Sequence, residues 1–140
     1  MVMRYWHGGH TKHRLLYHLV WIPKYRKRVL SGKIAATLTH LFYEACKVNN
    51  WWIEELKILP DHVHLLIQVQ PSESISQVVQ SLKGGSSHYL RNELPDLEEY
   101  IWGDSFWADG YFAETVGSTS ASNVKKYIRE NRDTMPLQPK

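Results

Sequence analysis

The stretch Pro60-Asp61-His62-Val63-His64-Leu65-Leu66-Ile67-Gln68-Val69 has the alternating pattern that predicts a β-strand. Successive side chains of a strand point to opposite faces, so one face is apolar and carries Val63, Leu65, Ile67 and Val69. The other face carries His62, His64, Leu66 and Gln68. Residues two apart in a strand are separated by about 6.5–7 Å, so both imidazoles can reach one cation. The same pattern also suits two polar side chains on the solvent side of a half-buried strand.

Composition predicts a single domain over residues 1–140. The chain is 43% hydrophobic, which is enough for a core at this length. It has no apolar run that could span a bilayer and no signal-peptide pattern, so we expect a cytoplasmic protein without membrane contact. The single Cys46 cannot form an internal disulfide or a thiolate cluster, and we expect it to serve packing.

Basic residues are concentrated in one segment. The net charge is only +3, although the isoelectric point is about 9.0, which indicates a locally basic surface. Five of the six residues in the segment Pro23-Lys24-Tyr25-Arg26-Lys27-Arg28 are basic or aromatic. A solvated turn explains such charges, and a surface that contacts phosphates and bases explains them equally well.

Hydrophobic periodicity predicts an alternation of strands and helices. The run His13–Ile22 is apolar on both faces, which is typical of a central strand. A hairpin turning at Pro60-Asp61 should join Trp51–Leu59 to the histidine-bearing strand. The remaining predicted elements are a helix from Ser31 to about Asn49, a helix from Ser74 through Leu90, a strand within Phe106–Val116 interrupted near Gly110, and a short helix over Asn123–Arg132.

Two glycines interrupt the second predicted helix in the stretch Lys83-Gly84-Gly85-Ser86-Ser87. Each glycine inside a helix costs roughly 1 kcal/mol relative to alanine. A close approach of another backbone or of a nucleic-acid strand would compensate this cost, and a simple kink is the alternative. The spacing is not that of a phosphate-binding P-loop.

The C-terminal helix has little to bury. Its only apolar stripe is Val124 and Ile128, so it must dock elsewhere on the chain or on a partner subunit. Tyr127 and Asn131, four residues apart, share one face of this helix. We expect residues 1–12 to form a loose arm and residues 133–140 a disordered tail.

A tyrosine near a two-histidine ion site suggests strand-transfer chemistry. A phenol, with an ordinary pKa near 10, is a poor nucleophile unless its target is made more electrophilic. A divalent ion held by two imidazoles and one oxygen ligand does so at a phosphate. The resulting phosphotyrosine conserves the bond energy, so a second strand end can reverse the attack.

With these parts, the sequence resembles the HUH single-strand DNA transposases with one catalytic tyrosine, which small bacterial and archaeal insertion sequences encode. The resemblance follows family order across nearly the whole chain. Its matching stretches are Tyr17-His18-Leu19-Val20-Trp21, Pro23-Lys24-Tyr25-Arg26, Leu59-Pro60-Asp61-His62-Val63-His64-Leu65, Leu82-Lys83-Gly84-Gly85-Ser86-Ser87, Thr115-Val116-Gly117 and Val124-Lys125-Lys126-Tyr127-Ile128.

The resemblance implies an α+β, ferredoxin-like antiparallel sheet with packed helices and a mobile C-terminal tyrosine helix. It implies that His62 and His64 bind Mg²⁺ or Mn²⁺. Tyr127 would attack the scissile phosphate, leaving a 5′-phosphotyrosine and a free 3′-OH. The expected partners are single-stranded DNA with subterminal hairpins and a second copy of the chain. In the resulting homodimer, a hinge at Gly117 would allow the tyrosine helix to complete the other subunit's site.

One position departs from the family pattern. The family commonly has Gln as third metal ligand four residues after the tyrosine, where this chain has the shorter Asn131. Glu130 is the alternative ligand, and Asp61 is a candidate for orienting an imidazole. Expected DNA contacts are Lys24, Tyr25, Arg26, Lys27, Arg28 and Lys83.

Two other functions are alternatives to this one. Histidine-triad nucleotide hydrolases need a third histidine at position 66, which is Leu66. A non-catalytic DNA- or RNA-binding regulator of the same fold stays open, because intact ligands do not demonstrate turnover.

Overall fold

The computed structural model describes residues 6–7, 12–95, 97, 105–117 and 120–130. Its elements, in chain order, are β1 (Trp6–His7), β2 (Lys12–His13), β3 (Leu15–Trp21), a 3-10 turn (Lys24–Arg26), α1 (Gly32–Val48), β4 (Trp52–Leu59), β5 (His62–Val69), α2 (Ile75–Glu93), β6 (Phe112–Thr115) and α3 (Ala121–Arg129). None of the helices described is long and apolar enough to cross a membrane.

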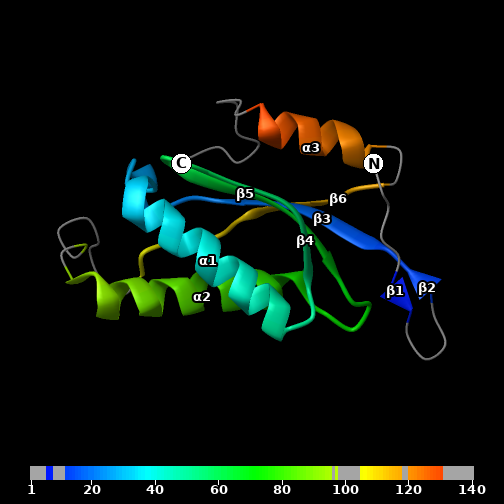
Figure 1. The fold of residues 1–140 in the computed structure, drawn as a ribbon, viewed down its shortest axis with the longest axis horizontal. Helices are drawn as coiled ribbons and strands as arrows, with labels where there is room; N and C mark the ends of the chain where they lie inside the picture. Colours follow the sequence, from blue (N-terminus) through cyan, green and yellow to red (C-terminus); the bar gives the residue numbers. More distant parts are fainter. Residues whose placement is uncertain (1–5, 8–11, 96, 98–104, 118–119, 131–140) are drawn as a thin grey trace.

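The main sheet has four antiparallel strands in the order β4-β5-β3-β6. With α1 after β3 and α2 after β5, this is the ferredoxin-like order, so the predicted fold class is confirmed. The helices α1 and α2 cover one face of the sheet and α3 lies over the other (Figure 1). The histidine-bearing strand β5 is therefore central, with partners on both edges and helices on both faces.

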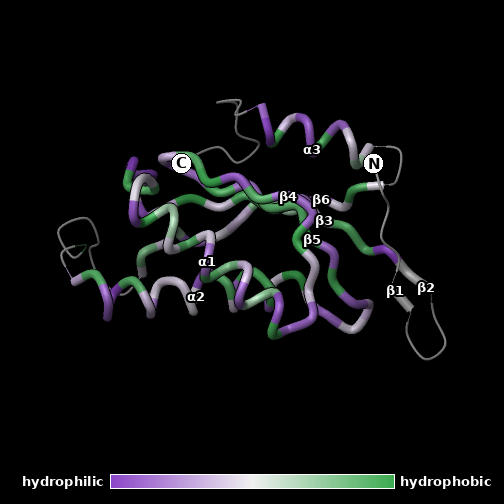
Figure 2. Tube along the Cα trace, viewed as in Figure 1, coloured by the Kyte–Doolittle hydropathy of each residue, from purple (hydrophilic) through white to green (hydrophobic). Residues whose placement is uncertain are grey.

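The main core lies between the sheet and the α1/α2 layer. The apolar face of β5 contributes side chains that are almost fully buried, as the alternation predicted: Val63, Leu65, Ile67 and Val69. Apolar stripes of α1 and α2 pack against it through Leu38, Phe42, Cys46, Val78, Val79, Leu82 and Leu90. Hydrophobic residues follow these two helices and the central strands, whereas α3 is mostly hydrophilic (Figure 2).

The helix α2 runs without interruption through Gly84 and Gly85. The kink considered for this position is absent from α2. A methyl group added at either glycine would meet no atom within 4 Å, so no part of the described chain approaches closely there either. The two glycines leave an open strip along the helix surface.

The N-terminal arm differs from the sequence-based expectation, whereas the last strand agrees with it. The arm over residues 1–12 was expected to be loose, but Trp6–His7 pairs antiparallel with Lys12–His13. Strands of two residues are too short to give a readable periodicity. In the last strand, the interruption predicted near Gly110 is confirmed, because Gly110 turns with φ +83°. The regular strand is limited to Phe112–Thr115, and Trp107 forms an isolated bridge with Pro23. The tail 133–140 lies outside the described residues.

Candidate metal and tyrosine site

The two histidines of β5 lie on the sheet face covered by α3. His62 and His64 are 2% and 1% exposed, and their ring centroids are 4.8 Å apart. The solvent-facing alternative for this pair is therefore excluded. Buried imidazoles need defined hydrogen-bond or metal partners, because a buried polar atom without one costs about 1–3 kcal/mol.

His62 is oriented by the residue before it. Its Nδ1 lies 2.7 Å from Asp61 Oδ1, and a carboxylate can only accept, so Nδ1 carries the hydrogen. The other ring nitrogen, Nε2, is buried and has no hydrogen-bond partner among the described residues. A bare, buried imidazole nitrogen whose opposite nitrogen donates to a carboxylate is the arrangement typical of a metal ligand.

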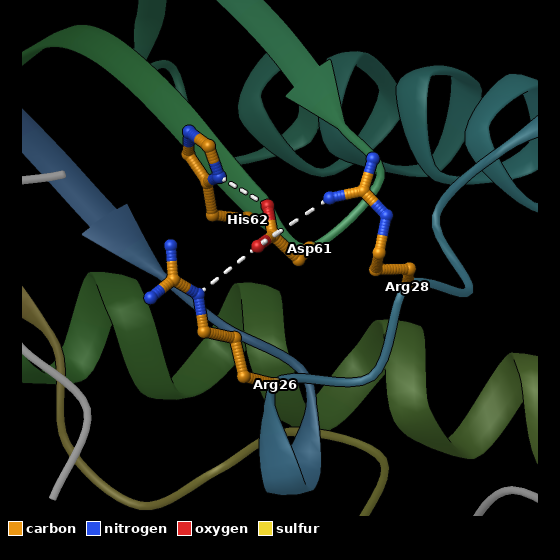
Figure 3. A network of polar contacts seen from close by, with 4 residues as sticks. All are labelled: Arg26, Arg28, Asp61 and His62. Atoms are coloured by element: carbon orange, nitrogen blue, oxygen red, sulfur yellow. Dashed lines mark hydrogen bonds and ion pairs between the residues drawn. The ribbon is translucent and has the colours of Figure 1, made fainter. Parts of the chain in front are cut away.

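Asp61 is itself fixed by arginines from the turn after β3 (Figure 3). Arg26 Nε donates to Asp61 Oδ2 over 3.0 Å, and Arg28 lies 4.0 Å from the same oxygen. Burial tends to raise the pKa of Asp61, but the hydrogen bonds and positive charges of His62 and Arg26 outweigh it and lower that pKa. Asp61 therefore stays ionised beside His62.

Arg26 takes a direction that sequence reasoning did not anticipate. Tyr25 and Arg26 both have left-handed backbone, with φ 62° and 52°, which non-glycine residues seldom adopt. This turn bends Arg26 back to Asp61, so its side chain is part of the site's support and not a simple outward DNA contact. Tyr25 stays 65% exposed, with Lys24 Nζ 5.8 Å from its ring centroid.

His64 has a partner that sequence reasoning missed. His18 on β3 is buried, and its Nε2 lies 3.0 Å from His64 Nδ1. On its other side His18 Nδ1 lies 3.2 Å from Glu114 Oε1 on β6. Burial lowers the pKa of His18, against the raising effect of Glu114. Burial, with the neighbouring charges of His62 and His18, lowers the pKa of His64 to about 3.

These shifts predict a metal-free protein that loses stability on mild acidification. Unfolded imidazoles protonate near pH 6.5, whereas the lowered pKa of folded His64 is about 3. The unfolded chain thus binds more protons in this window, and the free energy of unfolding falls as pH falls. The slope is at most about 1.4 kcal/mol per pH unit for each such histidine.

The measurement is urea denaturation at about pH 7, 6 and 5 with a chelator present. His64→Gln should give a shallower slope than the unsubstituted chain. The matched control is His40→Gln on α1, because His40 is exposed and solvated in both states. Equal slopes for both variants would contradict the prediction.

Tyr127 lies over His64 and His18. Its ring centroid is 5.6 Å from that of His64 and 6.3 Å from that of His18, both edge-on. It packs with Val124 against a small second cluster formed by Leu16, Leu66, Val116, Ala121 and Ile128. One chain thus brings the predicted nucleophile and both predicted metal ligands together.

Ion pairs supply the docking of α3 that its thin apolar stripe could not predict. Lys125 Nζ lies 3.0 Å from Glu54 Oε2, and Arg129 Nε donates to Glu55 Oε2 over 2.9 Å. The amide of the fully buried Gln68 donates to the other oxygen of Glu54 over 2.6 Å. The strand β4 therefore holds the tyrosine helix by charge as well as by packing.

Removing the Lys125 charge should loosen this helix. In Lys125→Met the stem is retained, but the largely buried Glu54 carboxylate loses its cation, which costs about 1–3 kcal/mol. Amide hydrogen exchange in α3 should then be faster while exchange in β5 stays slow. The matched control is Lys126→Met, whose side chain is 74% exposed. Equal exchange in the two variants would contradict a docking role for Lys125.

The third metal ligand stays a prediction. Asn131 lies outside the described residues. Glu130 is exposed and forms the C-terminal cap of α3. Its Oε1 lies 3.8 Å from Lys126 Nζ. The part of the chain that the structure describes brings no three His, Cys, Asp or Glu side chains together as a metal site. Asn131, with Glu130 as the alternative, therefore stays the predicted source of the third ligand.

Two further predicted residues have defined surroundings. Lys83 Nζ donates to the carbonyl oxygens of Ala108 and Gly110 over 2.7 and 3.0 Å, so it holds this loop against α2. Burial lowers the pKa of Lys83. Gly117 is exposed just after β6, and its carbonyl accepts hydrogen bonds from the backbone and hydroxyl of Ser120. It thus lies at the junction between the sheet and α3.

Comparison with known proteins identifies the family. The sequence pattern described as "Transposase IS200 like" matches residues 11–131. The chain is 34% identical over 121 residues to the ISDra2 transposase TnpA of Deinococcus radiodurans, covering 86% of each chain. It is 32% identical to the transposase for insertion sequence element IS200 of Salmonella typhimurium, covering 86% of this chain and 79% of that one.

Solved structures agree with this assignment. A crystal structure of a protein described as a transposase from Deinococcus radiodurans R1 superposes with a TM-score of 0.74 at 30% identity, covering 91% of this chain and 98% of that one. A REP-associated tyrosine transposase bound to a REP hairpin superposes with a TM-score of 0.63 at 14% identity, covering 92% and 72%, and shares the fold. The chain therefore belongs to the IS200-like transposase family, whose members are DNA-transposing enzymes.

Proposed function

We propose that this protein cleaves and rejoins single-stranded DNA at insertion-sequence ends through a 5′-phosphotyrosine on Tyr127. The observation that carries the proposal is the edge-on position of the Tyr127 ring, 5.6 Å from that of His64. The ring of His62, whose buried Nε2 has no hydrogen-bond partner among the described residues, lies 4.8 Å from that of His64, centroid to centroid. A tyrosine close to two histidines that can hold a divalent ion suits metal-assisted phosphoryl transfer to the phenol oxygen.

The site fits a divalent cation, Mg²⁺ or Mn²⁺. Its ligands would be Nε2 of His62, Nε2 of His64 and an oxygen of Asn131 or, failing that, Glu130. When bound, the cation supplies positive charge at the scissile phosphate. Asp61 keeps its role through the hydrogen bond that leaves His62 Nε2 bare, and Arg26 keeps Asp61 in place.

The chemical step is an exchange of phosphoester bonds. The Tyr127 oxygen forms a bond to phosphorus while the bond from phosphorus to the 3′ oxygen of the preceding nucleotide breaks. The phenol proton passes to solvent, and the released 3′ oxygen takes up a proton as a hydroxyl. Rejoining is the reverse reaction with a different 3′-OH, so it needs no external energy source.

DNA would approach over the basic turn after β3. Lys24, Tyr25, Lys27 and Arg28 lie beside the Asp61 end of β5, and Arg28 is 71% exposed. The open strip at Gly84 and Gly85 offers a second surface on which a strand could lie close to backbone. The fold-related REP-associated transposase was solved with a hairpin, which supports hairpin recognition as the proposal for this chain.

Removing charge from this turn should weaken DNA binding in a salt-dependent way. Each lost phosphate contact lowers the slope of log affinity against log salt by about 0.7 for a single strand. The variant is Lys24→Gln/Lys27→Gln/Arg28→Gln, titrated with a fluorescent single strand at several salt concentrations. The control is Lys47→Gln, exposed near the C-terminal end of α1. An unchanged slope in the triple variant would make these ordinary surface charges.

We further propose a homodimer in which tyrosine helices can be exchanged about Gly117. The proposal is supported by the ion pair between Arg129, whose side chain is 64% exposed, and Glu55, because a charge pair at a surface can be released and remade. In the exchanged form, Tyr127 of one subunit would lie over His62 and His64 of the other.

The experiment is a covalent-adduct assay. The protein is incubated with single strands copied from the DNA that flanks its gene, together with Mg²⁺ or Mn²⁺, and separated under denaturing conditions. A protein–DNA adduct supports the proposal. Tight binding of the same strands without an adduct would instead favour the non-catalytic regulator.

A further inference from the structure

His18 and Glu114 lie outside the set of residues that the proposed chemistry uses. Both contact the site through one side of His64. His18 is 3% exposed, and its ring is nearly parallel to that of His64, with centroids 5.3 Å apart and an interplanar angle of 13°. The sheet register explains the placement, because Glu114 is paired with His18, and Val20, two residues further along β3, is paired with His64.

The three side chains form one hydrogen-bonded chain across three strands. Glu114 Oε1 lies 3.2 Å from His18 Nδ1, and His18 Nε2 lies 3.0 Å from His64 Nδ1. Glu114 is half exposed and, as a carboxylate, can only accept. The donor and the acceptor of each hydrogen bond in this series then follow from Glu114.

The hydrogen positions can be assigned one ring at a time. Since Glu114 accepts, the hydrogen of the neutral His18 ring is on Nδ1 and its Nε2 is an acceptor. Since His18 Nε2 accepts, His64 must donate from Nδ1. A neutral imidazole has only one ring hydrogen, so His64 Nε2 is left bare.

We propose that Glu114 and His18 are positioning residues that select the tautomer of His64 in which Nε2 is free to bind the metal. The arrangement matches that of His62, where Asp61 accepts from Nδ1 directly and leaves Nε2 without a partner. The carboxylate that acts on His62 is adjacent in sequence, whereas the one that acts on His64 is 50 residues away and acts through a second imidazole.

This inference rests on the proposed role of His64 as a metal ligand, but its first test does not require a metal. Long-range proton–nitrogen NMR spectra of the metal-free protein distinguish the two imidazole tautomers, and His64→Gln identifies the signals of that ring. We expect both His18 and His64 to carry hydrogen on Nδ1. Hydrogen on Nε2 of His64 in the unsubstituted protein would overturn the proposal.

Two amide substitutions separate selection of the tautomer from simple packing. In His18→Gln the side-chain oxygen can reach the position of Nε2 and accept from His64. In His18→Asn the amide can still meet Glu114 but is too short to reach His64. The asparagine variant should populate the Nε2–H form of His64 and bind Mn²⁺ about 10- to 100-fold more weakly in calorimetry. The glutamine variant should stay within a few fold of the unsubstituted protein.

Equal tautomer populations and equal Mn²⁺ affinities in the two amide variants would show that His18 only packs. If either variant fails to fold, Glu114→Ala supplies the test, because position 114 is exposed on an edge strand. It should release the His18 hydrogen from Nδ1 and mix both tautomers of His64. Thr115→Ala, on the opposite face of β6, is the matched control and should leave both rings unchanged.

The outcomes also separate this inference from the proposed function. Tautomers as assigned and Mn²⁺ binding, without any covalent adduct, would refute strand cleavage and leave the positioning role intact. Adduct formation that is unaffected in His18→Asn, with an unchanged His64 tautomer, would refute the positioning role alone.

Discussion

Tyr127→Phe should abolish the covalent protein–DNA adduct, lowering its rate of formation by about 10³-fold or more. The substitution removes only the phenolic oxygen that would bond to phosphorus. The ring can keep its edge-on contacts with His64 and His18 and its packing against the cluster under α3. The variant should therefore fold, bind Mn²⁺ and bind single-stranded DNA like the unsubstituted protein.

The matched control is Tyr43→Phe, on the exposed side of α1 beyond the other face of the sheet. An adduct that survives in Tyr127→Phe would refute Tyr127 as nucleophile.

The same variant tests the proposed exchange of helices. Mixed with His64→Ala subunits it should regain some activity if Tyr127 can act across the dimer. No rescue in heterodimers shown to form would mean that each site is built within one chain.

His62→Ala and His64→Ala should each lower adduct formation by about 10²- to 10³-fold, because loss of one ligand weakens the charge held at the scissile phosphate. Mn²⁺ binding measured by calorimetry should fall in parallel. His62→Ala leaves the Asp61 carboxylate with Arg26 and Arg28, so the turn after β3 should keep its position.

The control for both variants is His40→Ala, an exposed histidine on α1. A chelator should reproduce the loss in the unsubstituted protein, and added Mn²⁺ should reverse it. Full adduct formation with a chelator present would show that the two imidazoles serve a purpose other than metal binding.

Which residues share a face of β5 could be predicted from the sequence, because side chains along a strand alternate with a period of two. The alternation of Val63, Leu65 and Ile67 required the two histidines to share the opposite face, and the structure confirms this. The central position of β3 followed in the same way from its doubly apolar pattern. Both inferences needed only local sequence and the rule that apolar faces are buried.

His18 could not be found in that way. It lies in a strand that is buried on both faces, so its polarity reads as an exception among apolar residues and not as part of a site. Its role depends on how β3 pairs with β5 and with β6, and no local pattern encodes that register. The one available signal was a histidine in a strand predicted to be buried, because a buried imidazole needs a hydrogen-bond partner.

The side-chain directions of Arg26 and Lys83 could not be predicted from the sequence either. Arg26 and Lys83 were predicted as DNA contacts, but Arg26 returns to Asp61 through a left-handed turn and Lys83 donates to two loop carbonyls. The contacts by which α3 docks could not be predicted for a related reason. Its apolar stripe is thin, and the ion pairs with Glu54 and Glu55 join residues about 70 positions apart.

The short edge strand β6 links both halves of the site. It carries Glu114, and its last residue is two positions before Gly117, from which the tyrosine helix follows. Slipping this strand by one residue would turn Glu114 to the opposite face and shift the start of α3 by about 3.3 Å. Related chains should therefore tolerate insertions and deletions in the loop before β6 far better than between Glu114 and Tyr127. In that second segment, the number of residues determines where the tyrosine lies relative to the histidines.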